Sequence, residues 1–305
     1  MDYKKIIKSR NFRIQILRLL SFVPDKLMLK IQYRIKTGHK LNLKDPKRFT
    51  EKLQWYKLYY KNPLMIQCVD KYDVREYVKS KGLEDILIPC YGVFDSPDEI
   101  NWDALPTRFV MKDTLGGGGN AVVIIKDKSV EDIKELKSRA AEWVVIDSSK
   151  PDAGREWPYY SGKNHRIIIE EYIEDKGENQ CHGLIDYKFF CFNGRTQFIY
   201  VMGDREVGQS VSVGLYDRNF NKLPVIRSGD ADIGEMPKPK NYYEMRAIAE
   251  SLSADFPHVR VDLYSVDDKT LFGELTFYNA SGYMKYEPDS FDVEIGKFFP
   301  LIEMK

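Results

Sequence analysis

The chain has 305 residues, and its 47 Lys and Arg nearly balance 46 Asp and Glu, so that the formal net charge is +1. This balance argues against a general nucleic-acid-binding protein, which usually carries a clear basic excess. Hydrophobic residues make up 43% of the chain and aromatic residues 13%, which excludes intrinsic disorder. The length allows one large domain or two medium ones.

The charge is unevenly distributed along the chain. Residues 1–52 carry 15 Lys and Arg against 4 Asp and Glu, whereas residues 53–305 carry 32 against 42. No stretch reaches the roughly 18 apolar residues of a membrane span, and no signal peptide is recognised. Four widely spaced cysteines and four histidines without ligand spacing predict neither a disulfide framework nor a zinc site. We therefore expect a cytoplasmic protein.

The basic N-terminal region predicts two helices, over residues 4–23 and after Pro24. The second has apolar residues at helical spacing, which we expect on one face: Leu27, Met28, Ile31 and Ile35. Lys and Arg are interleaved with them. Two interpretations stay open, a surface helix pair with its charges in water, which is the more common case, and an interfacial region in which residues 1–36 contact an anionic membrane. The second would place the protein at the inner face of the cytoplasmic membrane.

The remaining elements follow from apolar periodicity and turn residues. In chain order we predict helices 51–60 and 71–81, strands 86–94, 108–112 and 121–126, helix 130–144, strand 166–173, a hairpin of 187–192 and 195–201 around Asn193-Gly194, a hairpin-like pair within 211–226, helix 242–253, and strands 258–264 and 270–278 around Asp267-Asp268. Asp70 is expected to cap helix 71–81, and Gly82 to end it. The pattern predicts an α+β fold.

A glycine run carries the first chemical signal. Lys112 ends a predicted strand, Gly116, Gly117, Gly118 and Gly119 follow, and a second strand begins. Such a loop lets backbone N–H groups approach phosphate oxygens, with the lysine as an added charge, although a flexible surface hairpin has the same composition. A P-loop and a dinucleotide-binding site are not expected, because neither GxxxxGK[ST] nor a GxGxxG that opens a helix is present.

Paired charges carry the second signal. Asp262 and Glu274 lie on successive strands and can converge in a hairpin, where two carboxylates suit Mg²⁺. Arg260, two residues before Asp262, points to the same face and can neutralise charge on a transferred phosphoryl group. A salt-bridged strand pair is the alternative interpretation.

Two further pairs are weaker by themselves. The adjacent carboxylates Glu170 and Glu171 close an apolar strand and point to opposite faces, and such a segment can hydrogen-bond an adenine and a ribose. Asp186 and Lys188 share a strand face, where an ion pair between the two is the simplest interpretation.

In this order, the motifs resemble the ATP-grasp superfamily, and specifically the TupA-like ATP-grasp proteins of bacterial surface-polysaccharide loci. The segments that carry the resemblance are FTEKLQWYKLYYKNP (49–63), VDKYDVREYV (69–78), FVMKDTLGGGGN (109–120), GREWPYY (154–160), IEEYIED (169–175), DYKFFCFNG (186–194), VRVDLY (259–264) and FGELTFYNASGY (272–283). The resemblance implies an ATP-grasp fold, in which two α+β subdomains clamp ATP, after a basic helical N-terminal region. The implied domains are 1–48, a helical region 49–105, and an ATP-grasp domain 106–305 with a lid at 106–169, a hinge at 170–173 and a metal subdomain at 174–305.

The resemblance also implies site residues. The ATP-binding set is Lys71, Lys112, Gly116, Gly117, Gly118, Gly119, Glu170, Glu171, Tyr172, Ile173 and Asp186. The catalytic residues at the phosphates are Arg260 and Lys188. The Mg²⁺ ligands are Asp262, Glu274, Thr276 and Asn279, where Thr276 replaces the Asn that is usual in the superfamily, and Asn279 can substitute for it.

The implied activity is an ATP-dependent carboxylate–amine ligation through an acyl phosphate. The expected partners are a uronic acid of a polysaccharide or of its precursor, and an amino acid or small amine. Arg155 is expected to hold the acceptor carboxylate, because a guanidinium matches it bidentately, while Trp157 and Tyr159 stack on the sugar. An ordinary packed loop is the alternative for this segment.

Two other enzyme classes stay open. A glycosyltransferase is suggested by Asp230-Ala231-Asp232, but this DxD lies in a polar, Pro-bearing loop rather than at the end of an apolar strand, so we interpret it as solvated. An ATP-dependent sugar kinase would share the nucleotide site. The nucleotide that raises the melting temperature distinguishes ATP-dependent enzymes from one that uses a UDP-sugar.

Overall fold

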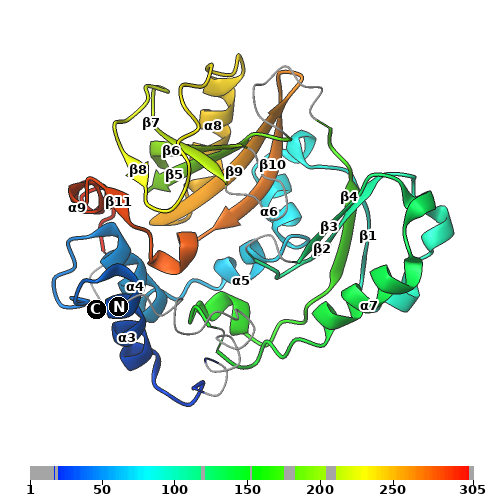
Figure 1. Cartoon of the computed structure of the whole chain (residues 1–305), viewed down its shortest axis with the longest axis horizontal. Coiled ribbons are helices and arrows are strands. Elements are labelled where there is room, and N and C mark those ends of the chain that lie inside the picture. Colours follow the sequence, from blue (N-terminus) through cyan, green and yellow to red (C-terminus); the bar gives the residue numbers. More distant parts are fainter. Residues whose placement is uncertain are drawn as a thin grey trace. The chain divides into compact units, whose positions relative to one another are not determined.

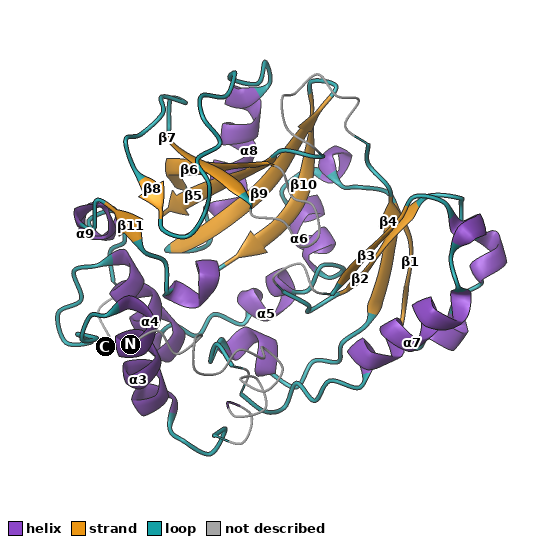
Figure 2. Ribbon diagram, viewed as in Figure 1, coloured by secondary structure: helices purple, strands orange, loops and turns teal. Residues whose placement is uncertain are grey.

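The computed structural model describes residues 17, 20–117, 121–151, 153–174, 183–203 and 211–301. Its residues cluster into two compact units. Unit 1 comprises Met1–Asn62, Pro151–Trp157 and Gly177–Lys305, and unit 2 comprises Pro63–Lys150 and Pro158–Lys176. Helices and antiparallel strands occur in both units, which confirms the α+β prediction (Figures 1 and 2).

Unit 1 is built on a five-stranded antiparallel sheet. Its strands in spatial order are β10 (Lys269–Thr276), β9 (His258–Val266), β5 (Asp186–Phe192), β6 (Arg195–Gly203) and β7 (Ser212–Asp217). The β5–β6 hairpin is confirmed, with Asn193 and Gly194 both at positive φ. Asp267 and Asp268 join β9 to β10, and both have positive φ. A turn with positive φ at both central residues has a twist that matches the right-handed twist of the two strands.

The hairpin-like pair predicted within 211–226 is largely wrong. β7 turns back at Asp217, and Leu223 N donates to Leu215 O at 2.8 Å. Pro224 follows, and because proline has no N–H the return arm cannot continue the ladder. The next strand, β8 (Ile226–Arg227), pairs instead with β11 (Tyr286–Glu287) in a separate two-stranded sheet.

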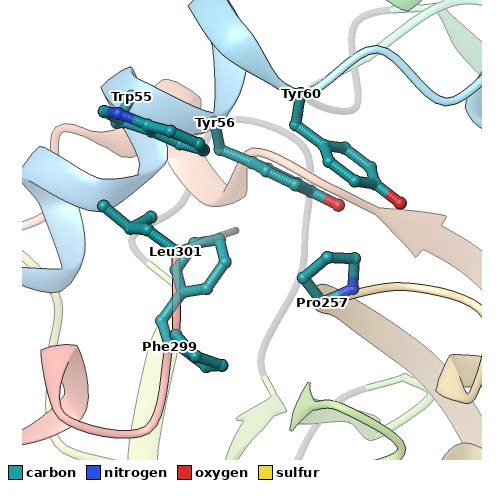
Figure 3. A pocket seen from close by; sticks show the side chains of 7 residues that line it. Trp55, Tyr56, Tyr60, Pro257, Phe299 and Leu301 are labelled. Atoms are coloured by element: carbon teal, nitrogen blue, oxygen red, sulfur yellow. The ribbon is translucent and has the colours of Figure 1, made fainter. Parts of the chain in front are cut away.

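Helices of unit 1 cover and extend this sheet. α8 (Tyr242–Ser253), predicted with these bounds, packs on β5, β6 and β9 through its buried residues. The other helices are α3 (Asp25–Thr37), α4 (Phe49–Tyr59) and α9 (Ser290–Gly296). At the end of α4, Trp55, Tyr56 and Tyr60 face Pro257, Phe299 and Leu301 (Figure 3). The Tyr56 and Phe299 rings pack edge to face with centroids 5.2 Å apart. The residues around this small pocket are therefore packed aromatic core residues.

Unit 2 is built on a four-stranded antiparallel sheet. Its spatial order is β1 (Cys90–Phe94), β4 (Ile167–Glu171), β2 (Phe109–Asp113) and β3 (Val122–Ile125). α7 (Ile133–Val144) buries Leu136, Ala140 and Trp143 in the core that this sheet forms. Short 3-10 turns complete the two units at Glu84–Ile86, Pro97–Glu99, Trp102–Ala104, Lys128–Val130, Trp157–Tyr160 and Asn279–Gly282.

Unit 2 begins with α5 (Leu64–Val69) and α6 (Val74–Ser80). The predicted helix 71–81 starts three residues later than expected. The Asp70 carboxylate accepts from the backbone N–H groups of Tyr72 and Asp73, both at 2.9 Å, and so holds residues 71–73 in a turn. Gly82, at φ 71°, ends the helix as predicted.

Of the predicted N-terminal helix 4–23, only residues 17 and 20–23 are described, and residues 20–23 form a turn and bend, so the predicted end of the helix is wrong. None of the described helices is long and apolar enough to cross a membrane. The compact units divide the chain after Asn62 and again around residues 151–157 and 176, not after 48 and 105. The predicted functional domains and the hinge therefore stay a prediction.

Candidate active site

Six polar residues share one face of the unit 1 sheet. In β-pairing, Lys188 lies opposite Asp262, Asp262 opposite Glu274, and Arg260 opposite Thr276. Directly opposed residues on neighbouring strands point to the same side, and Asp186 joins them through its alternation with Lys188. The hairpin predicted from the sequence thus does bring Asp262 and Glu274 together.

Arg260 is the centre of this unit 1 cluster. It grips Asp262 bidentately, with Nε to Oδ1 and Nη2 to Oδ2 both at 2.6 Å, and Nη2 also donates to Glu274 at 3.1 Å and Thr276 at 2.9 Å. Nη1 donates to the amide oxygen of Asn279. Burial by itself would lower the pKa of Arg260, but Asp262 and Glu274 outweigh it and raise the pKa. The guanidinium is therefore a permanent buried cation.

Lys188 lies between two carboxylates. Its Nζ is 2.6 Å from Asp186 Oδ2 and also donates to Asp262, and the lysine side chain is only 7% exposed. Burial raises the pKa of the Asp262 carboxyl, and the charges of Arg260 and Lys188 oppose that shift. Counting only these five described side chains, with the carboxylates of Asp186, Asp262 and Glu274 and the cations of Lys188 and Arg260, the formal charge is −1.

The donor types of this cluster fit Mg²⁺. Carboxylate, amide and hydroxyl oxygens of Asp262, Glu274, Asn279 and Thr276 all accept from one cationic group, Arg260, so they already converge on a positive charge. Among the described residues, however, no three His, Cys, Asp or Glu side chains are arranged to hold a metal. Because Arg260 already donates hydrogen bonds to these oxygens, a bound magnesium ion would share them with its guanidinium.

Unit 2 carries a second charged cluster. Glu170, at the end of β4, accepts from Lys112 Nζ at 2.7 Å and from Arg75 Nη1 at 3.4 Å, and Arg75 also donates to Ile88 O at 2.9 Å. Glu170 is buried and Glu171 half-exposed, as expected for neighbours on opposite strand faces. Among the described residues, the two cations Lys112 and Arg75 thus face the one carboxylate of Glu170, and these three side chains have a formal charge of +1.

Lys71 is held at the start of the glycine run. Its N–H donates to Thr114 O at 2.9 Å, and its Nζ donates to Gly116 O. Glycine is required at position 116, because a Cβ there would collide with the Cβ of Ala121, whereas Gly117 borders open space. Gly118 and Gly119 lie outside the described residues.

The predicted hinge, residues 170–173, begins within the last two residues of β4 and continues past its end. The Arg108 guanidinium lies over the Tyr172 ring, 5.4 Å from its centroid, and Ile173 is half-buried. The predicted adenine contacts of these residues stay a prediction.

A family model described as TupA-like ATPgrasp matches residues 51–300. The chain belongs to the TupA-like ATP-grasp family. Membership confirms the resemblance and the ATP-grasp fold that it implies. No curated protein matches the chain.

Solved structures similar to this ATP-grasp chain include two ligases and a synthetase. They are D-alanine–D-alanine ligase from Bacillus anthracis (19% identity, TM-score 0.41, 69% of this chain and 57% of that one), D-cycloserine synthetase DcsG (18%, 0.41, 70% and 64%), and D-alanine–D-alanine ligase from Helicobacter pylori (12%, 0.42, 84% and 68%). The chain spans 57% of the length of the first of these.

Arg155 does not have the surroundings predicted for a substrate-binding residue in this ATP-grasp protein. It is 2% exposed, and its guanidinium donates to Leu20 O at 2.7 Å, to Val23 O at 3.1 Å and to Asp25 Oδ1 at 2.7 Å. The acceptors are backbone carbonyls just before α3 and the first residue of α3. Since the guanidinium is buried among partners of the chain itself, the prediction that it holds an acceptor carboxylate is corrected to a structural role.

The two aromatic residues predicted to stack on a sugar lie in a short 3-10 turn, Trp157–Tyr160. Lys61 Nζ lies over the Trp157 ring at 4.8 Å, and among the described residues the buried indole N–H has no hydrogen-bond partner. Tyr159 is half-buried. Their sugar-binding role stays a prediction.

Sequence reasoning missed two buried residues of α4, Gln54 and Lys57. The Lys57 side chain is fully buried and donates to Gly154 O at 2.7 Å and Ser281 O at 2.9 Å, and Gln54 donates to Gly282 O at 2.9 Å. They hold the turn that follows Asn279, in which Ala280 and Ser281 have left-handed φ. The sequence did carry a signal for them. A Lys and a Gln lie inside the aromatic run LQWYKLYY, and polar residues in such a run are expected to be buried with it.

The DxD segment is only partly solvated as predicted, since Asp232 is exposed but the Asp230 side chain is 20% exposed, and both carboxylates are paired with cations. Lys222 Nζ lies 2.8 Å from Asp232, and its hydrogen bond lowers the pKa of Asp232, while Arg227 pairs with Asp230.

Proposed function

We propose that the protein is an ATP-dependent carboxylate–amine ligase that works through an acyl phosphate. The observation that carries the proposal is the unit 1 cluster, in which Arg260 draws Asp262, Glu274 and Asn279 around one cationic point beside Lys188. Family membership supplies the expectation of ATP. Charge stabilisation of a transferred phosphoryl group needs such cations and needs no nucleophile of the protein.

We assign adenine and ribose to Glu170, Glu171, Tyr172 and Ile173, with Asp186 near the ribose and phosphates. Lys71, Lys112 and the N–H groups of the glycine run are assigned to the phosphates. Asp262, Glu274, Thr276 and Asn279 would hold magnesium, which neutralises phosphate charge when bound. Arg260 and Lys188 orient the γ-phosphoryl group and stabilise its charge during transfer.

The reaction has two steps. A carboxylate oxygen of the acceptor attacks the γ-phosphorus, the bond to the β-γ bridging oxygen breaks, and ADP leaves. The amine nitrogen then attacks the acyl carbon, phosphate leaves with the electron pair, and the nitrogen loses a proton. The acyl phosphate must be kept from water, and a loop that closes over it does this.

For the substrates, we propose a uronic acid of a surface polysaccharide or of its lipid-linked precursor, and an amino acid or small amine. The support is the resemblance to proteins of surface-polysaccharide loci. The reaction would take place in the cytoplasm, where ATP is supplied.

The test incubates the protein with ATP, Mg²⁺, a panel of uronic acids and mixed amino acids, and measures ADP and product mass. ADP together with an amide is expected. A phosphorylated sugar as the end product would instead identify a kinase, and stabilisation by a UDP-sugar but not by ATP a glycosyltransferase. Lys188→Met should abolish the product, while Lys222→Met, which removes the partner of Asp232 in the same unit, should retain it.

A further inference from the structure

α3 has two apolar faces, and only one is used in the fold of unit 1. Met28, Leu29 and Tyr33 are buried, and the Tyr33 hydroxyl lies 2.8 Å from Thr50 Oγ1. Leu27, Ile31 and Ile35, which are 51%, 45% and 49% exposed, recur every four residues and form a stripe on the outside. The sequence-based expectation that Leu27, Met28, Ile31 and Ile35 share one face is therefore wrong for Met28.

Cations flank this stripe along its whole length. Lys26, Lys30 and Arg34 each precede one of the three apolar residues, and all three are exposed. Lys30 and Arg34 also line a hollow of about 420 Å³ together with Lys40 and Leu41. Arg34 Nη1 donates to Gly38 O at 2.5 Å, which fixes the guanidinium at the end of the helix.

The helix is a rigid part of unit 1. Gln32 donates to Ala153 O at 3.0 Å and accepts from the Tyr283 hydroxyl at 2.6 Å. Asp25, the only acidic residue of α3, pairs with the buried Arg155 at 2.7 Å. The outer face therefore needs no local unfolding to bind a partner, and its acidic residue is already neutralised.

We propose that this outer α3 face, composed of Leu27, Ile31 and Ile35 with Lys26, Lys30, Arg34 and Lys40, docks the protein on an anionic phospholipid surface. The helix lies in the plane of the interface, the stripe enters the boundary between headgroups and acyl chains, and the basic hollow receives a lipid phosphate. The proposal is independent of the proposed ligase activity, since no residue of the active-site clusters takes part.

Charge and size favour a lipid surface over other occupants. A second copy of the chain would bring like charges together, and three aliphatic side chains fall short of the roughly 800 Å² that each partner of a stable interface buries. The phosphates of a nucleic acid would pair with the cations but would give the aliphatic stripe no apolar surface to contact. An anionic bilayer satisfies both chemistries at once.

The test is flotation of the full chain with vesicles of phosphatidylcholine alone and of phosphatidylcholine with phosphatidylglycerol. Binding is expected only to the anionic vesicles and is expected to weaken as salt is raised. The triple variant Lys26→Gln, Lys30→Gln, Arg34→Gln should bind more than tenfold more weakly, because each juxtamembrane cation contributes about a fivefold factor. The triple variant Leu27→Ser, Ile31→Ser, Ile35→Ser should lose binding to a similar extent.

Matched controls come from unit 2. Lys126→Gln, Lys134→Gln, Arg139→Gln removes three exposed cations, and Ile124→Ser, Val130→Ser, Val145→Ser removes three exposed apolar side chains. Both controls should bind as the unmodified chain does. Melting temperatures of all four variants establish that each is folded.

Four results would overturn the proposal. The first is that the unmodified chain ignores anionic vesicles, and the second is that the folded α3 variants bind them undiminished. The third is concentration-dependent dimerisation that disappears in the aliphatic triple variant, which would assign the stripe to a second copy. Inorganic phosphate at matched ionic strength should not displace the protein, and displacement would assign the hollow to a free anion.

Discussion

The two charged clusters of this protein differ in burial and in sign. In unit 1, Lys188 and Arg260 lie on the central strands β5 and β9 among three carboxylates, and both side chains are less than 10% exposed. In unit 2, Lys112 lies on β2 with its side chain 22% exposed, and it shares the single carboxylate of Glu170 with Arg75. One cluster has an excess of negative charge, and the other an excess of positive charge.

This difference matches the two kinds of ligand charge in a magnesium–nucleotide complex. A cluster with more carboxylates than cations attracts a cation, and one with more cations than carboxylates attracts phosphates. The charges of unit 1 are more deeply buried, so removing the partner of one of them lowers the stability more than the same change does in unit 2. Mutations in the two clusters should therefore have different main effects. Those in unit 1 should mainly lower the folding stability, and those in unit 2 should mainly weaken nucleotide binding.

The largest effect is expected for Arg260→Met. It leaves Asp262 with one cation fewer in a buried site, which should lower the free energy of unfolding by about 3–5 kcal/mol. Arg218→Met removes an arginine of the same unit whose pair with Glu250 is more than a quarter exposed, and it should cost about 1 kcal/mol or less. Urea unfolding measures both, and equal losses would contradict the claim that burial distinguishes the clusters.

Burial in the unit 1 sheet also predicts how the stability of the protein depends on pH. Burial lowers the pKa of His258 on β9 to about 3, with Arg260 adding to the shift and the bond to Cys191 O opposing it. The fold holds neutral His258, so its stabilising contribution is complete above pH 6.5 and is lost as the pH falls toward 3, by up to about 1.4 kcal/mol per unit. Urea unfolding at several pH values should show a shallower acid slope in His258→Phe. An unchanged slope would mean that His258 is protonated in the folded protein.

A smaller effect on stability and a clear one on binding are expected for Lys112→Met. Loss of one charge-assisted contact to phosphate costs about 1.5–3 kcal/mol, which is roughly a 10- to 100-fold weaker ATP affinity. Lys128→Met, at a lysine of unit 2 that donates to Trp102 O and Leu105 O, should leave ATP affinity unchanged. Calorimetric titration with ATP distinguishes the two variants, and equal affinities would remove Lys112 from the nucleotide set.

The smallest effect on folding is expected for Glu274→Gln, because the Glu274 side chain is 44% exposed. The substitution removes the excess negative charge of the unit 1 cluster, so the Mg²⁺ concentration needed for half-maximal ATP turnover should rise. Glu250→Gln, in the same unit, is the control. A Mg²⁺ requirement that does not change would exclude Glu274 as a magnesium ligand.

Local chemistry was sufficient where neighbouring residues decide the outcome. The alternation of side chains along a strand and the turn at Asp267-Asp268 placed Asp262 next to Glu274, and the glycine run marked the close approach at Gly116. The Asn193-Gly194 hairpin was predictable for the same reason, because left-handed φ is inexpensive for these two residue types.

Pairings across long sequence separations could not be predicted in this way. Arg155 was predicted to bind a substrate carboxylate because a guanidinium suits one, but its acceptors lie 130 or more residues earlier in the chain. Lys57 likewise finds its carbonyl partners at Gly154 and Ser281. A buried cation takes whichever oxygens the fold brings to it, because leaving it unpaired costs more than any local preference can supply.

The separation of a basic N-terminal region from an acidic remainder was determined by the sequence alone, and so were the α+β fold class and the residues of the unit 1 cluster. Arg75 of the unit 2 cluster was found only in the structure. Only the tertiary structure decided which side of α3 is buried. Helical spacing places Leu27, Ile31 and Ile35 along one stripe, but the rotation of a helix about its axis depends on the surface against which it packs. Tyr33 and Leu29 fill that surface, and the aliphatic stripe with its row of cations is left exposed.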